Sequence, residues 1–150
     1  MPIRFLSTIE QWKDFSNLAP YPIELEGRIW PSTEHYYQFK KFEQADPEYA
    51  QKILEAQTPK EVKKLSMQND RRSPGWEENK VTILKTAIIK KFETYPALRT
   101  LLLSTGDEEL IEANPDDYFW GEGADGTGKN MMGTLLMNLR TQLKPKKATS

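Results

Sequence analysis

The sequence contains no cysteine and a single histidine, His35, and both shortages narrow the chemistry available to it. Without cysteine there is no disulfide framework, no thiolate ligand for zinc and no thiol nucleophile. One histidine excludes a metal site of several histidines, and any nucleophile–histidine relay that does not use His35. We therefore expect a site built from carboxylates, amines, amides and aromatic rings, with neither a metal nor a cofactor.

Long apolar runs and an excess of one charge are also absent. No stretch approaches the ~20 apolar residues of a membrane helix, and the first residues lack the apolar stretch of a signal peptide. The 21 Lys and Arg balance 22 Asp and Glu, which disfavours a broad surface for the phosphates of nucleic acid. We expect a cytoplasmic protein with no membrane association. The sequence does not indicate an oligomeric state.

Helix signals dominate after a short extended segment. Residues 23–30 alternate around Glu26-Gly27, which is typical of a β-hairpin. Cap residues, prolines and apolar periodicity then predict helices. These helices are expected near 33–44, after Asp46, after Thr58, over 78–93, from Pro96 to near Gly106, and over 132–143. Residues 108–113 are interpreted as a short strand.

This pattern predicts an α+β fold, a single compact, mainly helical domain with a small β-sheet. The domain is expected to span residues 1–143. The basic end of the chain, residues 144–150, is expected to be a disordered tail.

The segment after Pro31 has the first concentration of chemical groups. At 100° per residue, four polar side chains share one helical face: Glu34, Tyr37, Gln38 and Lys41. His35 and two phenylalanines point elsewhere, which suits packing. A face with a carboxylate, a phenol, an amide and an amine can donate, accept and transfer protons. A solvated surface stripe is the alternative.

Two further segments are rich in small polar residues and glycine. Phe15-Ser16-Asn17 precedes a proline-stiffened turn, where Ser and Asn are common for structural reasons alone. Residues 116–133 hold five of the eight glycines directly before the last helix. Backbone N–H groups at such a position suit a phosphate, although the P-loop spacing is absent because Asn130 follows Lys129. A binding site is favoured over a plain connector.

These segments, in this order, resemble the NADAR family, also called the YbiA-like family. The resemblance rests on six motifs between about Phe15 and Leu143. They are Phe15–Asn17; Pro31–Gln38 with Lys41-Phe42; Trp76 with Lys91-Phe92; Leu103–Asp107; Asp117–Gly121; and Gly126–Asn130 with Leu135–Arg140. One stretch, residues 70–75, looks shorter than in family members. Either Arg71 or Arg72 is the candidate contact to a substrate phosphate.

The resemblance implies hydrolysis of an N-glycosidic bond in a ribose-bearing substrate. The implied substrates are ribosylamino-pyrimidine intermediates of riboflavin biosynthesis, or ADP-ribose attached to guanine. The partner is then a small phosphoribosyl or ADP-ribosyl compound, or an ADP-ribosylated nucleic acid held by a basic patch of Lys60, Lys63 and Lys64. A non-catalytic module that binds ADP-ribose or a nucleotide, and a regulatory interaction protein, are the alternative functions.

Cleavage of such a bond needs a proton donor at the departing nitrogen, a stabiliser of positive charge at the sugar carbon, and a nucleophile. We expect Glu34 or Asp117 to be the acid, base or stabiliser, with both carboxylates facing one cavity. Lys41 is expected to attack the sugar carbon and form a Schiff base if its amine is desolvated. Electrostatic binding of substrate is the alternative role for Lys41. Lys40, about 100° away, is expected to be a solvated surface amine.

The other candidates are expected to bind the substrate. Trp120 and a tyrosine offer stacking faces for a flat base, and residues 121–128 offer backbone N–H groups to phosphate. The predicted binding residues are Ser16, Asn17, Tyr37, Gln38, Trp76, Trp120, Gly121, Gly123, Gly126, Gly128 and Asn130.

Overall fold

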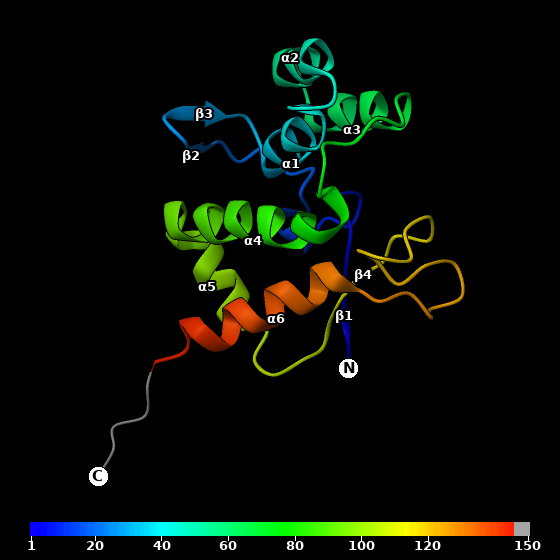
Figure 1. Ribbon diagram of the computed structural model, residues 1–150. Helices are drawn as coiled ribbons and strands as arrows, with labels where there is room; N and C mark the ends of the chain where they lie inside the picture. Colours follow the sequence, from blue (N-terminus) through cyan, green and yellow to red (C-terminus); the bar gives the residue numbers. More distant parts are fainter. Residues whose placement is uncertain (146–150) are drawn as a thin grey trace. The chain divides into compact units, whose positions relative to one another are not determined.

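The computed structural model describes residues 1–145 (Figure 1). These residues form two compact units. Unit 1 joins Met1–Ser16 to the part of the chain that begins at Tyr95, and unit 2 is Asn17–Thr94. Of the predicted basic tail, residues 146–150 lie outside the described residues.

Unit 2 contains one hairpin and four helices. Its elements are β2 (Ile23–Leu25), β3 (Arg28–Trp30), α1 (Thr33–Phe42), α2 (Pro47–Glu55), α3 (Pro59–Met67) and α4 (Trp76–Thr94). Helix α1 packs against the other three helices and against β3. Helix α1 therefore has one side that packs against these elements and another that carries polar groups.

Unit 1 contains the remaining elements. These are β1 (Ile3–Phe5), the short 3₁₀ helix η1 (Lys13–Phe15), α5 (Pro96–Ser104), β4 (Leu110–Glu112) and α6 (Met131–Leu143). Helix α6 packs against α5 and β4. The predicted strand at 108–113 is thus confirmed as β4.

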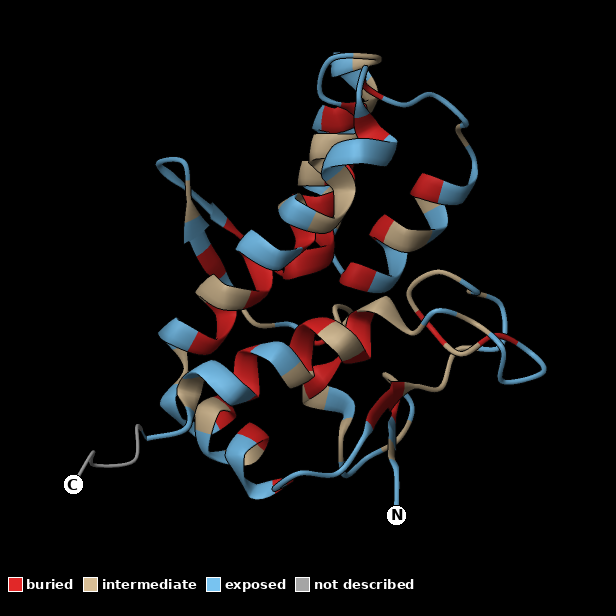
Figure 2. Ribbon diagram, turned by 60° about the horizontal axis from the view of Figure 1, so that its bottom comes forward, coloured by how far each residue is buried: buried red, intermediate tan, exposed pale blue. Residues whose placement is uncertain are grey.

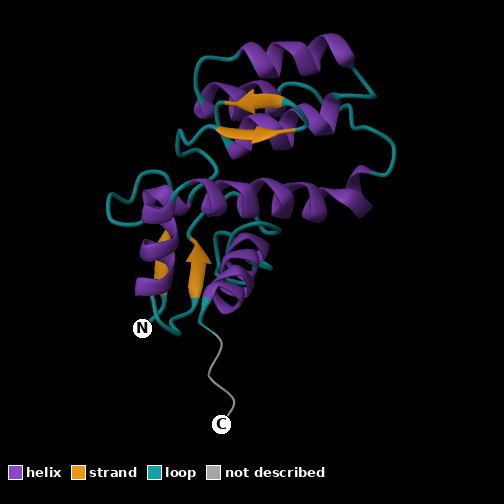
Figure 3. Cartoon of the chain, turned by 90° about the vertical axis from the view of Figure 1, so that its left-hand side faces the viewer, coloured by secondary structure: helices purple, strands orange, loops and turns teal. Residues whose placement is uncertain are grey.

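The α+β class with mainly helical content is confirmed, but the strands form two small sheets rather than one (Figure 3). Strands β2 and β3 pair antiparallel, with Ile23 opposite Trp30. Their turn places Glu26 and Gly27 at φ of 55° and 73°, as a tight two-residue hairpin requires. Strands β1 and β4 pair parallel, with Ile3 opposite Leu110; β1 was not predicted.

Capping chemistry sets the helix starts as predicted. The side chains of Ser32, Asp46 and Thr58 accept backbone N–H groups from the first turns of α1, α2 and α3. Pro47 and Pro59 occupy the first helical positions, where a missing N–H costs nothing. Each helix therefore begins at a residue that the sequence marks.

Apolar side chains of α1 join two clusters of unit 2. Tyr36 packs with Ile23, Trp30 and Ala87, and Phe42 packs with three residues of α2 and α3, namely Ala50, Ile53 and Val62. Buried and exposed residues follow one another along the helices as the chain turns (Figure 2). Among residues 1–145, no helix is long and apolar enough to cross a membrane.

Candidate active site

The polar face predicted for α1 is present, but it is buried rather than solvated. Glu34 and Gln38 are each 8% exposed. The Gln38 Nε2–H group donates to Oε1 of Glu34 over 2.8 Å, one helical turn away. A buried carboxylate needs such a donor, because an unpaired charge in an apolar environment is costly. The pair is therefore a built polar unit and not a surface stripe.

The other end of the Gln38 amide has no such partner. Its Oε1 atom is buried and accepts no hydrogen bond from any residue among 1–145. A buried acceptor that receives no hydrogen bond costs the folded state about 1–3 kcal/mol. Such an atom needs an explanation, and a donor from a bound ligand is one of them. Substrate binding by Gln38 stays a prediction.

Lys41, on the same face, has a lowered pKa. Burial lowers the pKa of its ammonium from the ordinary 10.5, and the Arg72 guanidinium lowers it further. The carboxylates of Glu34, Asp70 and Glu77 act in the opposite direction without reversing the shift. The Lys41 amine lies 5.1 Å from the centre of the Phe42 ring. Burial of the Lys41 amine agrees with the expected desolvation, and its role as a nucleophile stays a prediction. The effect of Arg72 on Lys41 was not predicted.

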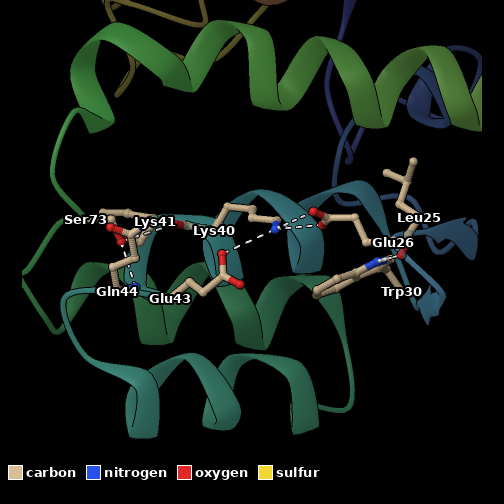
Figure 4. Close-up of polar contacts among 8 residues, drawn as sticks. All are labelled: Leu25, Glu26, Trp30, Lys40, Lys41, Glu43, Gln44 and Ser73. Atoms are coloured by element: carbon tan, nitrogen blue, oxygen red, sulfur yellow. Dashed lines mark hydrogen bonds and ion pairs between the residues drawn. The ribbon is translucent and has the colours of Figure 1, made fainter.

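Ser73 fixes the carboxyl-terminal end of α1 from a distant loop. Its backbone N–H and its hydroxyl both donate to the carbonyl oxygen of Lys41, over 2.8 and 2.9 Å. The same hydroxyl accepts the backbone N–H of Gln44 (Figure 4). The last carbonyls of a helix lack partners within the helix, so Ser73 supplies one and thereby positions the Lys41 backbone.

Aromatic and polar neighbours complete this part of unit 2. The Tyr37 and Trp76 rings lie 5.0 Å apart between centroids, and both residues are buried. The Thr33 hydroxyl donates to the side-chain oxygen of Asn17 over 2.8 Å, which ties the chain before the hairpin to the start of α1. Among the predicted residues, Asn17, Glu34, Tyr37, Gln38, Lys41 and Trp76 lie in unit 2.

His35 is structural, as its predicted packing face indicates. Its Nε2 donates to the carbonyl of Ala56 over 2.9 Å, so Nδ1 must accept the Ser32 hydroxyl at 2.7 Å. Ser32 in turn accepts the His35 backbone N–H. Burial lowers the pKa of the imidazole, against the carbonyl and Glu61, which raise it. The ring therefore stays neutral and links α1 to the end of α2.

The prediction for Lys40 was wrong. Its side chain is 16% exposed, and its ammonium lies 2.7 Å from Glu26 and 3.3 Å from Glu43. Burial alone would lower the pKa of Lys40, but these two carboxylates together raise it. Helical spacing gave the direction of the side chain correctly. It could not show that the hairpin turn brings a carboxylate to that side.

Asp117, the second candidate acid, lies in unit 1 and shapes its own loop. Its Oδ1 accepts the backbone N–H groups of Phe119 and Trp120 over 2.9 and 2.8 Å. This is the local turn that Asp commonly forms. A catalytic role for Asp117, and a cavity shared with Glu34, stay predictions.

In the glycine-rich segment, residues 121–128, backbone hydrogen bonds within the loop use some of the N–H groups that were predicted to bind phosphate. The N–H of Gly123 donates to the Asn114 carbonyl, and that of Gly128 to the Glu122 carbonyl. A β-carbon on Gly128 would overlap the carbonyl of Gly121, whereas one on Gly126 would meet nothing. The N–H groups of Gly123 and Gly128 are thus already used within the loop. Phosphate binding by this segment stays a prediction.

The other candidates of unit 1 also have structural contacts. Asn130 stands directly before α6 at φ 50°, where its side chain accepts the Glu112 N–H and donates to the Leu110 carbonyl. Trp120 packs edge-to-face against Phe119. Ser16 is buried and follows η1. Asn130 therefore holds β4 to α6, which was not predicted, and its role in substrate binding stays a prediction.

The two arginines near α4 are both exposed and paired. Arg71 lies 3.5 Å from Asp46, and Arg72 pairs with Glu77. Contact of either with a phosphate stays a prediction. Lys91 of α4 was not singled out as a candidate, yet it is only 1% exposed, with its ammonium 5.3 Å from the centre of the Tyr21 ring.

Comparison with known proteins identifies relatives along nearly the whole chain. N-glycosidase YbiA of Escherichia coli (strain K12) is 40% identical over 144 residues, which cover 94% of this chain and 88% of YbiA. The chloroplastic riboflavin biosynthesis protein PYRR of Zea mays is 37% identical over 155 residues, covering 94% of this chain but 25% of that protein. The NMR structure of E. coli YbiA matches with a TM-score of 0.84 and 38% identity, over 95% of this chain and 84% of that chain.

The family assignment agrees with the motifs and with the fold. The NADAR domain profile matches residues 4–144, a range that contains all six motifs. The similarity to the YbiA structure extends over both units. The chain therefore belongs to the NADAR domain family.

Proposed function

We propose that this NADAR protein hydrolyses the N-glycosidic bond of a small ribose-bearing substrate, and that the α1 face is its catalytic centre. The names of two relatives, an N-glycosidase and a riboflavin biosynthesis protein, support the reaction class. The observation that carries the site is the buried Glu34–Gln38 pair with its unpartnered amide oxygen. A cytoplasmic location is part of the proposal.

Gln38 orients the sugar in this proposal. Its Oε1 accepts a ribose hydroxyl, which is the kind of donor that a buried acceptor lacks. Its Nε2–H group meanwhile holds the Glu34 carboxylate in place. Binding and orientation of the sugar thus come from one amide, next to the carboxylate that moves protons.

Lys41 is the proposed nucleophile. Its lowered pKa increases the neutral fraction of the amine. Nζ forms a bond to the sugar carbon as the carbon–nitrogen bond to the base breaks, and the bonding electron pair leaves with the base. Glu34 takes the proton that the amine releases and passes it to the departing nitrogen. The lone pair on Nζ then forms a C=N bond as the ring oxygen leaves the same carbon and takes a proton from solvent, which gives a protonated Schiff base. Water adds to that carbon, the sugar departs as its aldehyde, and Lys41 regains its neutral amine as one proton returns to solvent.

Borohydride trapping tests the covalent step. We expect reduction during turnover to leave a stable adduct of the opened sugar on Lys41, and Lys41→Ala to lose both the adduct and the release of base. Peptide mapping must separate Lys41 from the buried Lys91. No adduct, together with substantial activity in Lys41→Ala, would instead support water activated by Glu34 or Asp117.

The substrate class requires a panel. A ribosylamino-pyrimidine phosphate and an ADP-ribosyl-guanine nucleic acid are each incubated with the protein, and the free base or ADP-ribose is measured. We expect the small substrate to be cleaved faster, because the net charge of −1 gives little general attraction to nucleic acid. Binding without release from any substrate would contradict the enzyme and support a binding module.

A further inference from the structure

The Gln38 amide offers an acceptor, and not a donor, to a ligand on the α1 face. Its Nε2–H group donates to Oε1 of Glu34 over 2.8 Å. Turning the amide over would place its oxygen against that carboxylate, where two acceptors repel, so the hydrogen bond fixes the orientation of the amide. The buried Oε1 atom then accepts nothing from residues 1–145. A ligand atom that pairs with Oε1 must therefore carry a hydrogen, which excludes phosphate oxygens and carbonyl groups.

The position of Gln38 between the two reacting groups selects the ligand atom. Gln38 lies one turn after Glu34 and three residues before Lys41, so the three side chains follow one another along one face of α1. In the proposed mechanism Lys41 bonds to the sugar carbon, and Glu34 serves the nitrogen that leaves that carbon. The ring oxygen on the same carbon has no hydrogen to donate. The nearest remaining donor is the hydroxyl on the adjacent carbon, which is the 2-hydroxyl of the sugar.

Pairing with this hydroxyl is favourable because the acceptor has already lost its water. A solvated amide oxygen must give up a hydrogen bond to water before it binds a ligand, which cancels much of the gain. Gln38 is 8% exposed, and its buried Oε1 gives up no such bond. A sugar with the hydroxyl satisfies the acceptor, whereas a sugar without it leaves the acceptor unpaired, and sites of this kind reject the analogue that lacks the donor.

We propose that Gln38 Oε1 accepts the 2-hydroxyl of the sugar, and that this contact restricts the protein to ribosides and excludes 2-deoxyribosides. The bonds between base and deoxyribose in DNA are then not substrates. This assignment of the 2-hydroxyl rests on the proposed function, because the place of the sugar carbon beside Lys41 is part of that proposal. Gln38 thereby sets substrate specificity, while Glu34 and Lys41 carry the chemistry.

Deoxy analogues of the substrate test this contact. The ribosylamino-pyrimidine phosphate and its 2-deoxy and 3-deoxy forms are compared in the unaltered protein by release of the base. We expect kcat/KM to fall about tenfold or more for the 2-deoxy form and to change much less for the 3-deoxy form. The 2-deoxy bond is intrinsically the more easily broken, because a 2-hydroxyl withdraws electrons from the reacting carbon, so slower cleavage reports lost recognition. Undiminished cleavage of the 2-deoxy form, or an equal loss for both analogues, would overturn the assignment.

A variant of Gln38 identifies the residue responsible. Gln38→Met keeps the length of the side chain and removes both polar atoms, so it should cleave the riboside and its 2-deoxy form with nearly equal kcat/KM. Gln51→Leu, which disrupts the exposed pair of α2, should retain the full preference for the riboside. A loss of folded protein lowers both rates together and leaves their ratio unchanged. A preference that survives in Gln38→Met would refute the role of Gln38.

Ligands that carry no base separate this contact from the proposed function. The amide signals of the Gln38 side chain are followed by NMR during titration with 1,4-anhydroribitol 5-phosphate and with its 2-deoxy form, neither of which can react. We expect these signals to shift with the first compound, at a Kd about tenfold or more below that of the second. If no substrate releases a base, the proposed function fails, while this difference in affinity still supports the contact. Equal affinities would contradict it.

Discussion

Gln38 and Glu34 form a buried amide–carboxylate pair across one turn of α1, with 2.8 Å between Nε2 and Oε1. The exposed surface of α2 has a similar pair, in which Gln51 donates to Glu55 over 3.1 Å. On the surface, water satisfies the remaining polar atoms of such a pair. In α1 the remaining Gln38 oxygen is buried without a partner among residues 1–145. The exposed Gln51–Glu55 pair is thus a matched control for substitutions in the buried Gln38–Glu34 pair.

Replacement of Gln38 should therefore separate binding from folding. Gln38→Leu removes the unpartnered oxygen and the donor to Glu34, and we expect kcat/KM to fall by about tenfold or more, since one or two hydrogen bonds are lost. The control Gln51→Leu should leave kcat/KM unchanged. Steady-state kinetics and thermal unfolding check both variants. A fall in kcat/KM that merely follows loss of folded protein would contradict a binding role for Gln38.

The pH dependence of activity should report the charges around Lys41. Arg72 lowers the Lys41 pKa and Asp70 raises it. In the proposed mechanism the neutral amine reacts, so activity should rise as the pH passes upward through the Lys41 pKa. Arg72→Gln should move this limb to higher pH and Asp70→Asn to lower pH. Both shifts should be small, because exposed charges are screened.

The experiment is a pair of pH–rate profiles at one ionic strength. Profiles that move in opposite directions identify the limb as the titration of Lys41. If both variants shift the limb in the same direction, or neither does, another group controls the rate. High salt should reduce both displacements.

Alanine at Gly128 and alanine at Gly126 should destabilise the protein for different reasons. Gly128→Ala forces a β-carbon onto the Gly121 carbonyl, and overpacking of this kind costs about 1–3 kcal/mol. Gly126→Ala meets no atom but keeps φ at +78°, which costs about 1–2 kcal/mol for an L-residue. Urea unfolding measures both. Because the Gly126 site is open, weaker inhibition by inorganic phosphate in Gly126→Ala would support phosphate binding, and unchanged inhibition would contradict it.

The pKa of His35 should lie below its ordinary value of 6.5, because burial lowers it. The unfolded chain binds a proton near that pH and the folded chain does not, so stability is fully present above pH 6.5 and is lost as the pH falls below it. As His35 is the only histidine, its imidazole signals in NMR report this directly. Titration of the folded protein at or above 6.5 would contradict the buried neutral ring.

Asp117 can be tested without loss of its turn. Asp117→Asn keeps an oxygen that accepts the Phe119 and Trp120 N–H groups, whereas Asp117→Ala removes it. We expect Asp117→Asn to unfold at nearly the native urea concentration and Asp117→Ala to lose about 1–2 kcal/mol. If the Asn variant folds normally but releases no base, the charge of Asp117 is catalytic. If it stays active, its role is structural.

Much of the local structure was predictable, because caps, prolines and apolar spacing act over a few residues. Pro47 and Pro59 begin helices as predicted, and Glu26-Gly27 forms the expected turn. Strand β1 is different. It is ordered by parallel pairing with Leu110–Glu112, far away in the sequence, which no local pattern reveals.

The site was predictable only where its residues are close in sequence. Glu34, Gln38 and Lys41 share one helix, so spacing alone brings them together. Ser73 and Arg72 reach Lys41 through the fold. The sequence did not mark Ser73, and it marked Arg72 for a different role, contact with phosphate. The glycines were interpreted as a phosphate cradle because glycine permits both bare N–H groups and close backbone contact. The structure shows close contact at Gly128.

Because Ser73 binds the Lys41 carbonyl, the length of the loop that carries Ser73 affects the surroundings of the Lys41 amine. Residues 68–75 connect α3 to α4, and Ser73 within them is bound to the last turn of α1. An inserted or deleted residue in this stretch changes where Ser73 can stand, and with it the Arg72 charge that lowers the Lys41 pKa. A change of loop length here can therefore change the pKa of the Lys41 amine while every residue of α1 stays the same.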